Sequence, residues 1–133
     1  MEQNQPKKAT LLIVDDEENL RKLYEETFIA EGYNVILADN GEDAIRMAKE
    51  HLPNIVIMDI RMPGMDGLNA MREIFRTISE IMVVLNSSYT HYKNNFMSWA
   101  TDAYVVKDKD LTELKKVVAE LIENNKNLHP HPR

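Results

Sequence analysis

The fold is decided by a short stretch near the start of the chain, TLLIVDD, at residues 10–16. The stretch is an apolar run that stops abruptly at two aspartates. Four more apolar runs of similar length occur at residues 34–38, 55–58, 81–85 and 103–106. Short, continuous apolar runs are typical of strands buried on both faces, as in parallel sheets. The runs therefore predict five strands of one parallel sheet.

Between these runs the apolar residues follow the i, i+3, i+4 spacing of amphipathic helices. The spacing predicts helices around residues 20–28, 44–52, 68–78 and 111–122, and a weaker, short helix at 91–99. Strand and helix thus alternate five times along the chain.

Residues at the expected boundaries agree with this alternation. Gly32 stands where a glycine would end the first helix, and Asn40 can cap the second helix. Pro53 ends that second helix. The alternation predicts an α/β fold of the flavodoxin-like (βα)5 type, a three-layer sandwich. Its five-stranded parallel sheet has the expected order 2-1-3-4-5.

Composition favours one globular domain that does not enter a membrane. The chain has 133 residues, of which 44% are hydrophobic and 29% charged, and single domains have roughly 100–200 residues. We expect one domain over residues 1–133, with its core at 10–124 and loose termini. No apolar run approaches the length of about 20 residues that a membrane span needs, and the first residues lack the pattern of a secretory signal.

Charge and cysteine content exclude further classes of function. The chain has 22 acidic and 16 basic residues, a formal net charge of -6, so direct binding to nucleic acid is not expected. It has no cysteine, which excludes disulfides, iron–sulfur clusters and cysteine nucleophiles and fits a cytoplasmic location.

Acidic residues gather at the ends of two predicted strands. Asp15 and Asp16 follow the first strand and Asp59 follows the third, which is its neighbour in the predicted order. Ligands of such sheets bind beyond the carboxyl ends of the strands. Three carboxylates in one pocket repel each other, so the arrangement needs a cation or raised protonation, and Mg²⁺ suits such oxygen ligands. Alternatively, each acid is a solvated or capping group, with Asp16 as a cap of the first helix.

Two further polar residues follow the remaining strands. Ser87 ends the fourth strand and Lys107 ends the fifth. Each has a plain structural interpretation, as a turn residue or as half of an ion pair. Together with the acids, however, they would supply a carboxylate nucleophile, a metal, a hydroxyl donor and a cation for phosphate oxygens. This set predicts a site for phosphoryl transfer.

These motifs resemble the receiver domain of two-component response regulators. The resemblance rests on IVDDE at residues 13–17, on IMDIRMPGMDG at residues 57–67, and on Ser87 and Lys107. It implies a phosphorelay signalling module in the cytoplasm that is not an enzyme, beyond gaining and losing its own phosphoryl group.

The resemblance also implies a role for each matching residue. Asp59 matches the aspartate that accepts a phosphoryl group from a phosphohistidine. Asp16 matches a direct Mg²⁺ ligand, and Asp15 one that acts through water. The backbone carbonyl of Arg61 matches a further metal ligand. Ser87 and Lys107 match residues that contact the phosphoryl group, and Tyr104 matches the aromatic residue whose rotamer reports the phosphorylation state.

Implied partners are a sensor histidine kinase or a histidine phosphotransfer protein, and a downstream target protein. Movement of Ser87 towards the phosphoryl group would open space for Tyr104 and change the face that the target reads. We expect a monomer or a weak homodimer. Because no residues for an output domain follow the last helix, we expect a stand-alone receiver or one cut from a longer regulator.

Several positions depart from the usual pattern of the family. Asp108 follows Lys107 where a proline after a cis peptide bond is common. A cis bond without proline costs about 2.5–4 kcal/mol, which leaves the isomer open. Ala100-Thr101 stands where Gly-Ala is common, and Asn86 ends a strand that is usually apolar.

Other functions compete with a phosphorylated receiver. A receiver-like module could bind a partner without phosphorylation, although the complete set of site residues argues against this. A flavin carrier of the same fold is disfavoured because the acids at residues 15–18 would repel the flavin phosphate. A phosphohydrolase would need a base for external substrates, and none is evident. The histidines lack the spacing of metal ligands: His51, His91, His129 and His131.

Overall fold

The structure is a computed structural model that describes residues 9–59, 67–87 and 102–125. Its five strands coincide with the five predicted runs, although the fourth begins and ends slightly later than expected. They are β1 (Thr10–Val14), β2 (Asn34–Ala38), β3 (Ile55–Met58), β4 (Met82–Ser87) and β5 (Ala103–Val106).

All neighbouring strands are parallel, and the sheet order β2-β1-β3-β4-β5 is the predicted one. The register places Val14 opposite Met58 across the β1–β3 pair. Asp15 and Asp59 are the next residues, so two acids leave adjacent strands side by side. The register of the sheet thereby positions the candidate site.

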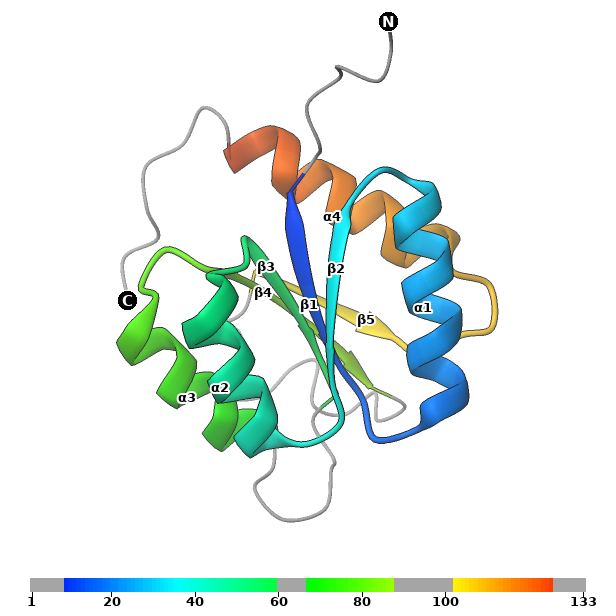
Figure 1. Ribbon diagram of the computed structural model, residues 1–133. Helices are drawn as coiled ribbons and strands as arrows, with labels where there is room; N and C mark the ends of the chain where they lie inside the picture. The colour runs from blue at the N-terminus through cyan, green and yellow to red at the C-terminus, as the bar shows by residue number, and fades with distance from the viewer. Residues whose placement is uncertain (1–8, 60–66, 88–101, 126–133) are drawn as a thin grey trace, which may run out of the picture.

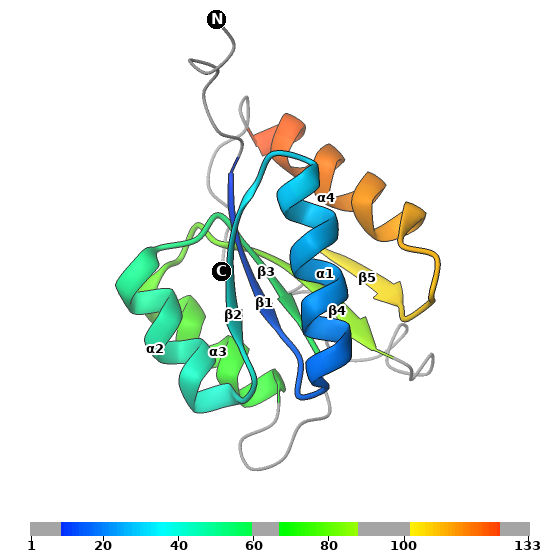
Figure 2. The ribbon, with the colours of Figure 1, turned by 45° about the vertical axis from the view of Figure 1, so that its right-hand side comes forward.

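Four helices cover the sheet in the described part of the chain: α1 (Glu18–Ala30), α2 (Gly41–His51), α3 (Gly67–Thr77) and α4 (Thr112–Asn125). Helices α2 and α3 lie on one face, and α1 and α4 lie on the other (Figures 1 and 2). The predicted three layers are confirmed, whereas the short helix predicted at 91–99 lies outside the described residues. None of these four helices is long and apolar enough to cross a membrane.

The hydrophobic core has two parts, one on each face of the sheet. Along β1, Leu12 and Val14 pack towards α2 and α3, whereas Leu11 and Ile13 pack with residues of α1 and α4. All four side chains are buried. Because alternate residues of a strand point to opposite faces, a strand covered on both sides is apolar throughout, which is why these strands are continuous apolar runs.

The helix boundaries follow the residues expected to set them, with one exception. The Asn40 side chain accepts a hydrogen bond from the Asp43 N–H at 2.8 Å and caps α2. Gly32, just after α1, has a φ of 99°, a conformation that favours glycine. The exception is Asp16, because α1 begins at Glu18, its N-cap residue is Glu17, and no side chain caps it. The suggestion that Asp16 caps this helix is therefore wrong.

Candidate functional site

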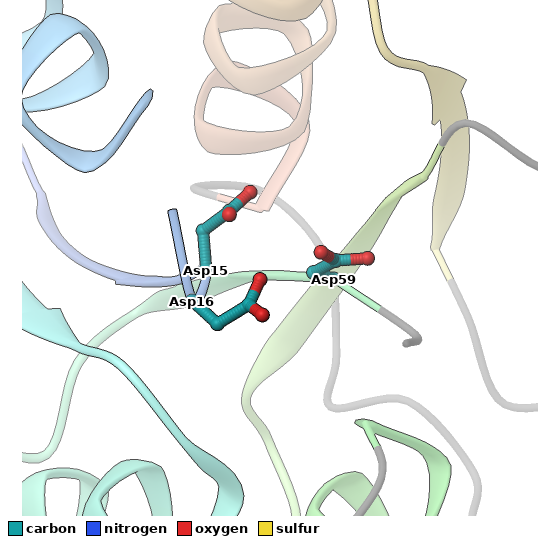
Figure 3. Close-up of side chains that lie close together, drawn as sticks. All are labelled: Asp15, Asp16 and Asp59. Atoms are coloured by element: carbon teal, nitrogen blue, oxygen red, sulfur yellow. The ribbon is translucent and has the colours of Figure 1, made fainter. Parts of the chain in front are cut away.

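Three aspartates meet where β1 and β3 end (Figure 3). One carboxylate oxygen each from Asp15, Asp16 and Asp59 lies within 4.8 Å of the other two. Asp15 and Asp59 are buried, with exposed fractions of 1% and 6%, whereas Asp16 is exposed. The predicted convergence of the three acids is confirmed.

Backbone hydrogen bonds extend the sheet as far as the two buried acids. The Asp15 N–H donates to the Ala38 carbonyl at 3.2 Å, and the Asp59 N–H donates to the Val14 carbonyl at 3.0 Å. Both carboxylates therefore start from backbone that three neighbouring strands hold in place. Their positions are set by the sheet and not by a loop.

Asp15 is further oriented by α1. Its Oδ1 accepts a hydrogen bond from the Glu17 N–H at 2.9 Å, and its backbone carbonyl accepts one from the Arg21 guanidinium at 2.8 Å. These contacts turn the chain from β1 into α1 and fix one oxygen of the carboxylate. The role of Arg21 was not apparent from the sequence.

Lys107 brings a positive charge to the two buried acids. Its Nζ lies 2.8 Å from Asp15 Oδ2 and 3.0 Å from Asp59 Oδ2, and its side chain is 13% exposed. Burial alone would lower the pKa of the Lys107 ammonium. The hydrogen bonds and charges of Asp15 and Asp59 outweigh burial and raise this pKa above its ordinary value. The lysine is therefore charged in the folded protein.

The charge balance of this pocket favours an additional cation. One ammonium faces three carboxylates, so the cluster keeps a net negative charge. Clustered carboxylate oxygens are hard ligands of the kind that bind Mg²⁺. Asp16 is suited to direct contact with a Mg²⁺ ion because its side chain is exposed. Both carboxylate oxygens of Asp15, in contrast, already accept hydrogen bonds from Glu17 and Lys107.

The other residues expected at the site are placed only in part. Ser87 ends β4 opposite Val106, the residue before Lys107, but its side chain lies outside the described part of the structure. Tyr104 is half-buried on β5 and packs against the core on the α2–α3 face. Arg61 lies outside the described residues. The Lys107–Asp108 peptide bond is trans, since the described residues contain no cis bond.

A second polar contact lies close to the pocket and was missed by sequence reasoning. The Asn86 amide donates a hydrogen bond to the Tyr24 hydroxyl at 3.0 Å, and both side chains are buried. Burial raises the pKa of the Tyr24 phenol, and the charges of Lys107, Asp15 and Asp59 also act on it. The only signal in the sequence was a polar residue in an otherwise apolar strand.

Comparison with protein families gives one match over most of the chain. The model described as "Response regulator receiver domain" matches residues 11–119. The regulatory protein AtoC of Escherichia coli K12 is 34% identical over 115 residues, which are 85% of this chain and 25% of that protein. The probable transcriptional regulator ycf27 of Guillardia theta is 34% identical over 122 residues, 90% of this chain and 48% of that protein. The chain thus spans only a quarter to a half of these curated relatives.

Solved structures agree with the family match. The response regulator protein TrrA of Thermotoga maritima, crystallised in complex with Mg²⁺-BeF, is 40% identical to this chain with a TM-score of 0.79. The match covers 84% of this chain and 97% of TrrA. A second crystal structure shows TrrA in complex with the histidine kinase ThkA, and there the TM-score is 0.78 at the same identity and coverage.

Proposed function

Because the chain belongs to the response regulator receiver domain family, we propose that it accepts a phosphoryl group on Asp59 in the presence of Mg²⁺. The observation that carries the proposal is the convergence of Asp59 with Asp15, Asp16 and the Lys107 ammonium. A member of this family is a signalling domain, not a catalytic enzyme in the usual sense.

The reaction would begin with attack by the Asp59 carboxylate on a phosphorus atom bound to a histidine nitrogen. A P–O bond forms, the P–N bond breaks, and the imidazole leaves with the electron pair of that bond. Such transfers depend mainly on in-line positioning and on stabilising charge on the phosphoryl oxygens. Lys107 already lies 3.0 Å from Asp59 Oδ2, so its ammonium is in place to contact one of those oxygens.

The residues present fit a divalent cation beside Asp59. Asp16 and Asp59 would hold Mg²⁺ directly, Asp15 would act through water, and the backbone carbonyl of Arg61 would complete the protein ligands. The bound cation would supply positive charge next to the phosphoryl oxygens. The crystal structure of the relative TrrA in complex with Mg²⁺-BeF supports Mg²⁺ as the cation.

Phosphorylation would shift the domain between two states that partners distinguish. The Ser87 hydroxyl would move to the phosphoryl group, and Tyr104, half-buried on β5, would repack into the space left behind. If this route is correct, Tyr104→Ala should abolish phosphorylation-dependent partner binding while Asp59 still becomes phosphorylated.

The proposed upstream partner is a sensor histidine kinase or a histidine phosphotransfer protein. Support comes from TrrA, which forms a complex with the histidine kinase ThkA. We further propose a downstream target protein, a single receiver domain over residues 1–133, a monomeric or weakly dimeric state and a cytoplasmic location.

Intact-mass analysis tests the acceptor directly. The protein is incubated with Mg²⁺ and a small acyl phosphate, and wild type is compared with Asp59→Asn. We expect one added phosphoryl group on wild type and none on Asp59→Asn. Asp39→Asn is a matched control, because Asp39 also follows a strand, β2, but is exposed and lies outside the acidic cluster. No addition to wild type would favour a module that binds partners without phosphorylation, and addition to Asp59→Asn would exclude Asp59 as the acceptor.

A further inference from the structure

A buried hydrogen bond ties helix α1 to the carboxyl end of β4. The Asn86 side-chain amide donates to the Tyr24 hydroxyl at 3.0 Å, and the two residues are 62 positions apart in the sequence. Tyr24 is 1% exposed and Asn86 2%. The contact therefore joins two distant parts of the chain inside the core.

The polar character of this contact is unusual for its surroundings. Among the described residues, the buried polar or charged side chains are Asp15, Asp59 and Asn86, and two of these belong to the acidic pocket. The side chains that precede Asn86 on β4 are all apolar. A buried amide is unfavourable unless it is hydrogen-bonded, and a satisfied buried polar pair favours one specific arrangement over others.

The pair lies next to the residues that the proposed reaction uses. Asn86 is opposite Val105 in the register, and the next residue, Ser87, is opposite Val106, which precedes Lys107. Tyr24 and Asn86 both line a hollow of about 350 Å³ at the amino-terminal end of α4. Tyr24 and Lys107 both line a second hollow of about 290 Å³. Tyr24 thus lies near both the pocket lysine and the end of β4.

The pair also connects two elements that carry site residues. Helix α1 begins directly after the turn that holds Asp15 and Asp16, and Tyr24 is a buried residue of that helix. Asn86 is the residue before Ser87. Asp59 is held independently, by its backbone hydrogen bond to β1. A change at the pair would therefore act on the end of β4, whereas backbone hydrogen bonds to neighbouring strands hold Asp15 and Asp59 in place.

We propose that Tyr24 and Asn86 are positioning residues whose hydrogen bond sets the end of β4 and thereby holds Ser87 within reach of a phosphoryl group on Asp59. The inference rests on the proposed function of Asp59. Neither residue touches the reacting atoms, so both act through Ser87.

Tyr24→Phe removes the hydroxyl and keeps the ring. We expect phosphorylation by a small acyl phosphate at saturating Mg²⁺ to slow about threefold to tenfold, the range that corresponds to losing one hydrogen bond. Mg²⁺ affinity should change less than the phosphorylation rate, because backbone hydrogen bonds to neighbouring strands hold Asp15 and Asp59. An unchanged phosphorylation rate would overturn the proposal.

Tyr33→Phe is the matched control. Tyr33 is a second buried tyrosine of the same core cluster and is 6% exposed. Its ring packs edge-on against the ring of Phe28, with 5.9 Å between the ring centroids. It precedes β2 and lies at the opposite, amino-terminal edge of the sheet. We expect its phosphorylation rate to match wild type, and equal slowing in both variants would show a general effect of a lost core hydroxyl, against the proposal.

Two double variants test the route through Ser87 and the coupling of Tyr24 with Asn86. If the pair acts through that residue, Tyr24→Phe should cause no additional slowing in a Ser87→Ala background. Full additional slowing there would contradict the route. Adding Asn86→Leu to Tyr24→Phe should likewise slow the reaction no further, because the two side chains act as one contact.

Hydrogen exchange separates this inference from the proposed function. Amide exchange at residues 85–87 should be faster in Tyr24→Phe than in wild type and unchanged in Tyr33→Phe. Unchanged exchange in Tyr24→Phe would overturn the anchoring of β4 whether or not Asp59 is phosphorylated. Absence of phosphorylation in wild type would instead overturn the proposed function and the role of the pair in phosphotransfer. Faster exchange in Tyr24→Phe would in that case still support the anchoring of β4.

Discussion

Lys107 contacts both buried aspartates of the pocket, and its charge is the counterpart of theirs. Burial alone would lower the pKa of Lys107, but its contacts with Asp15 and Asp59 outweigh burial and raise the pKa. The folded state therefore holds this proton more tightly than the unfolded state. The stabilisation is fully present below the ordinary lysine pKa of 10.5 and is lost as the pH rises through the folded value. Around neutral pH the charge of Lys107 is therefore insensitive to pH.

Removal of this ammonium should be costly in the absence of divalent cations. In Lys107→Met, two buried carboxylates would lose their counter-ion, which typically costs about 3–5 kcal/mol. We expect a loss of this size in the free energy of unfolding, measured by urea denaturation in the presence of a chelator. Added Mg²⁺ should recover part of it.

Lys115→Met is the control for this prediction. The Lys115 ammonium lies 3.9 Å from a Glu31 carboxylate oxygen, and the two side chains are 40% and 42% exposed. Exposed pairs of this kind contribute about 0–1 kcal/mol, so the control should lose little. Similar losses in the two variants would show that the burial of the Lys107 pair has no special effect.

Individual site residues differ in how far the sequence predicts them. Asp15 and Asp59 could be found because each directly follows an apolar run, and parallel strands end at the same edge of a sheet. The partnership of Tyr24 with Asn86 could not be found, because residues 62 positions apart meet only through the packing of α1 on the sheet. Helical spacing identified position 24 as a core position but carried no information about its hydroxyl.

At the scale of elements, the starts of α1 and α2 are built differently. Helix α2 has the Asn40 cap, whereas α1 has no side-chain cap at its Glu17 N-cap residue. The Glu17 N–H is instead bonded by Asp15 from the pocket. A capping role for Asp16 was the alternative interpretation, but the helix begins later and Asp15 accepts the local N–H. This arrangement leaves the exposed Asp16 carboxylate for the pocket.

The Asn40 cap should make a measurable contribution to stability. Asn40→Ala removes the acceptor for the Asp43 N–H and should lower the free energy of unfolding by about 1 kcal/mol. Asn40→Ser keeps a side-chain oxygen and should stay close to wild type. Chemical denaturation of the three proteins measures the difference, and an equal loss for alanine and serine would argue against a capping role.

The elements themselves were well predicted, and their ends less so. Apolar runs and helical spacing identified every strand and helix in the described part of the chain. Pro53 follows the end of α2 as expected, but Leu52, which separates it from the last helical residue His51, adopts a left-handed conformation with a φ of 48°. Glycine is the usual residue for such a helix end, so the sequence contained no signal for this conformation at a leucine.

At the scale of the whole molecule, the sheet concentrates negative charge at one edge of an already acidic protein. If the pocket binds Mg²⁺ as proposed, the folded state should gain stability by mass action, by about 2.7 kcal/mol at a cation concentration 100 times the Kd. We expect the melting temperature to rise with Mg²⁺ at constant ionic strength and to saturate.

Asp16→Asn should remove most of this Mg²⁺-dependent rise, because Asp16 is the exposed member of the acidic cluster. Glu18→Gln removes one negative charge from a nearby exposed residue that lies outside the cluster and should leave the rise intact. Loss of the Mg²⁺ effect in both variants would indicate non-specific screening instead of a defined site.

The order of the strands also has a consequence during synthesis of the protein. Lys107 follows β5, the last strand made, and is 48 positions beyond Asp59. At a translation rate of roughly 5–20 residues per second, the ribosome needs about 2–10 s to add that stretch. For this interval the nascent chain carries Asp15 and Asp59 without their own counter-charge. Until β5 docks and brings Lys107 to the sheet, the two acids lack this counter-charge from the chain and depend on water and ions of the surrounding solution.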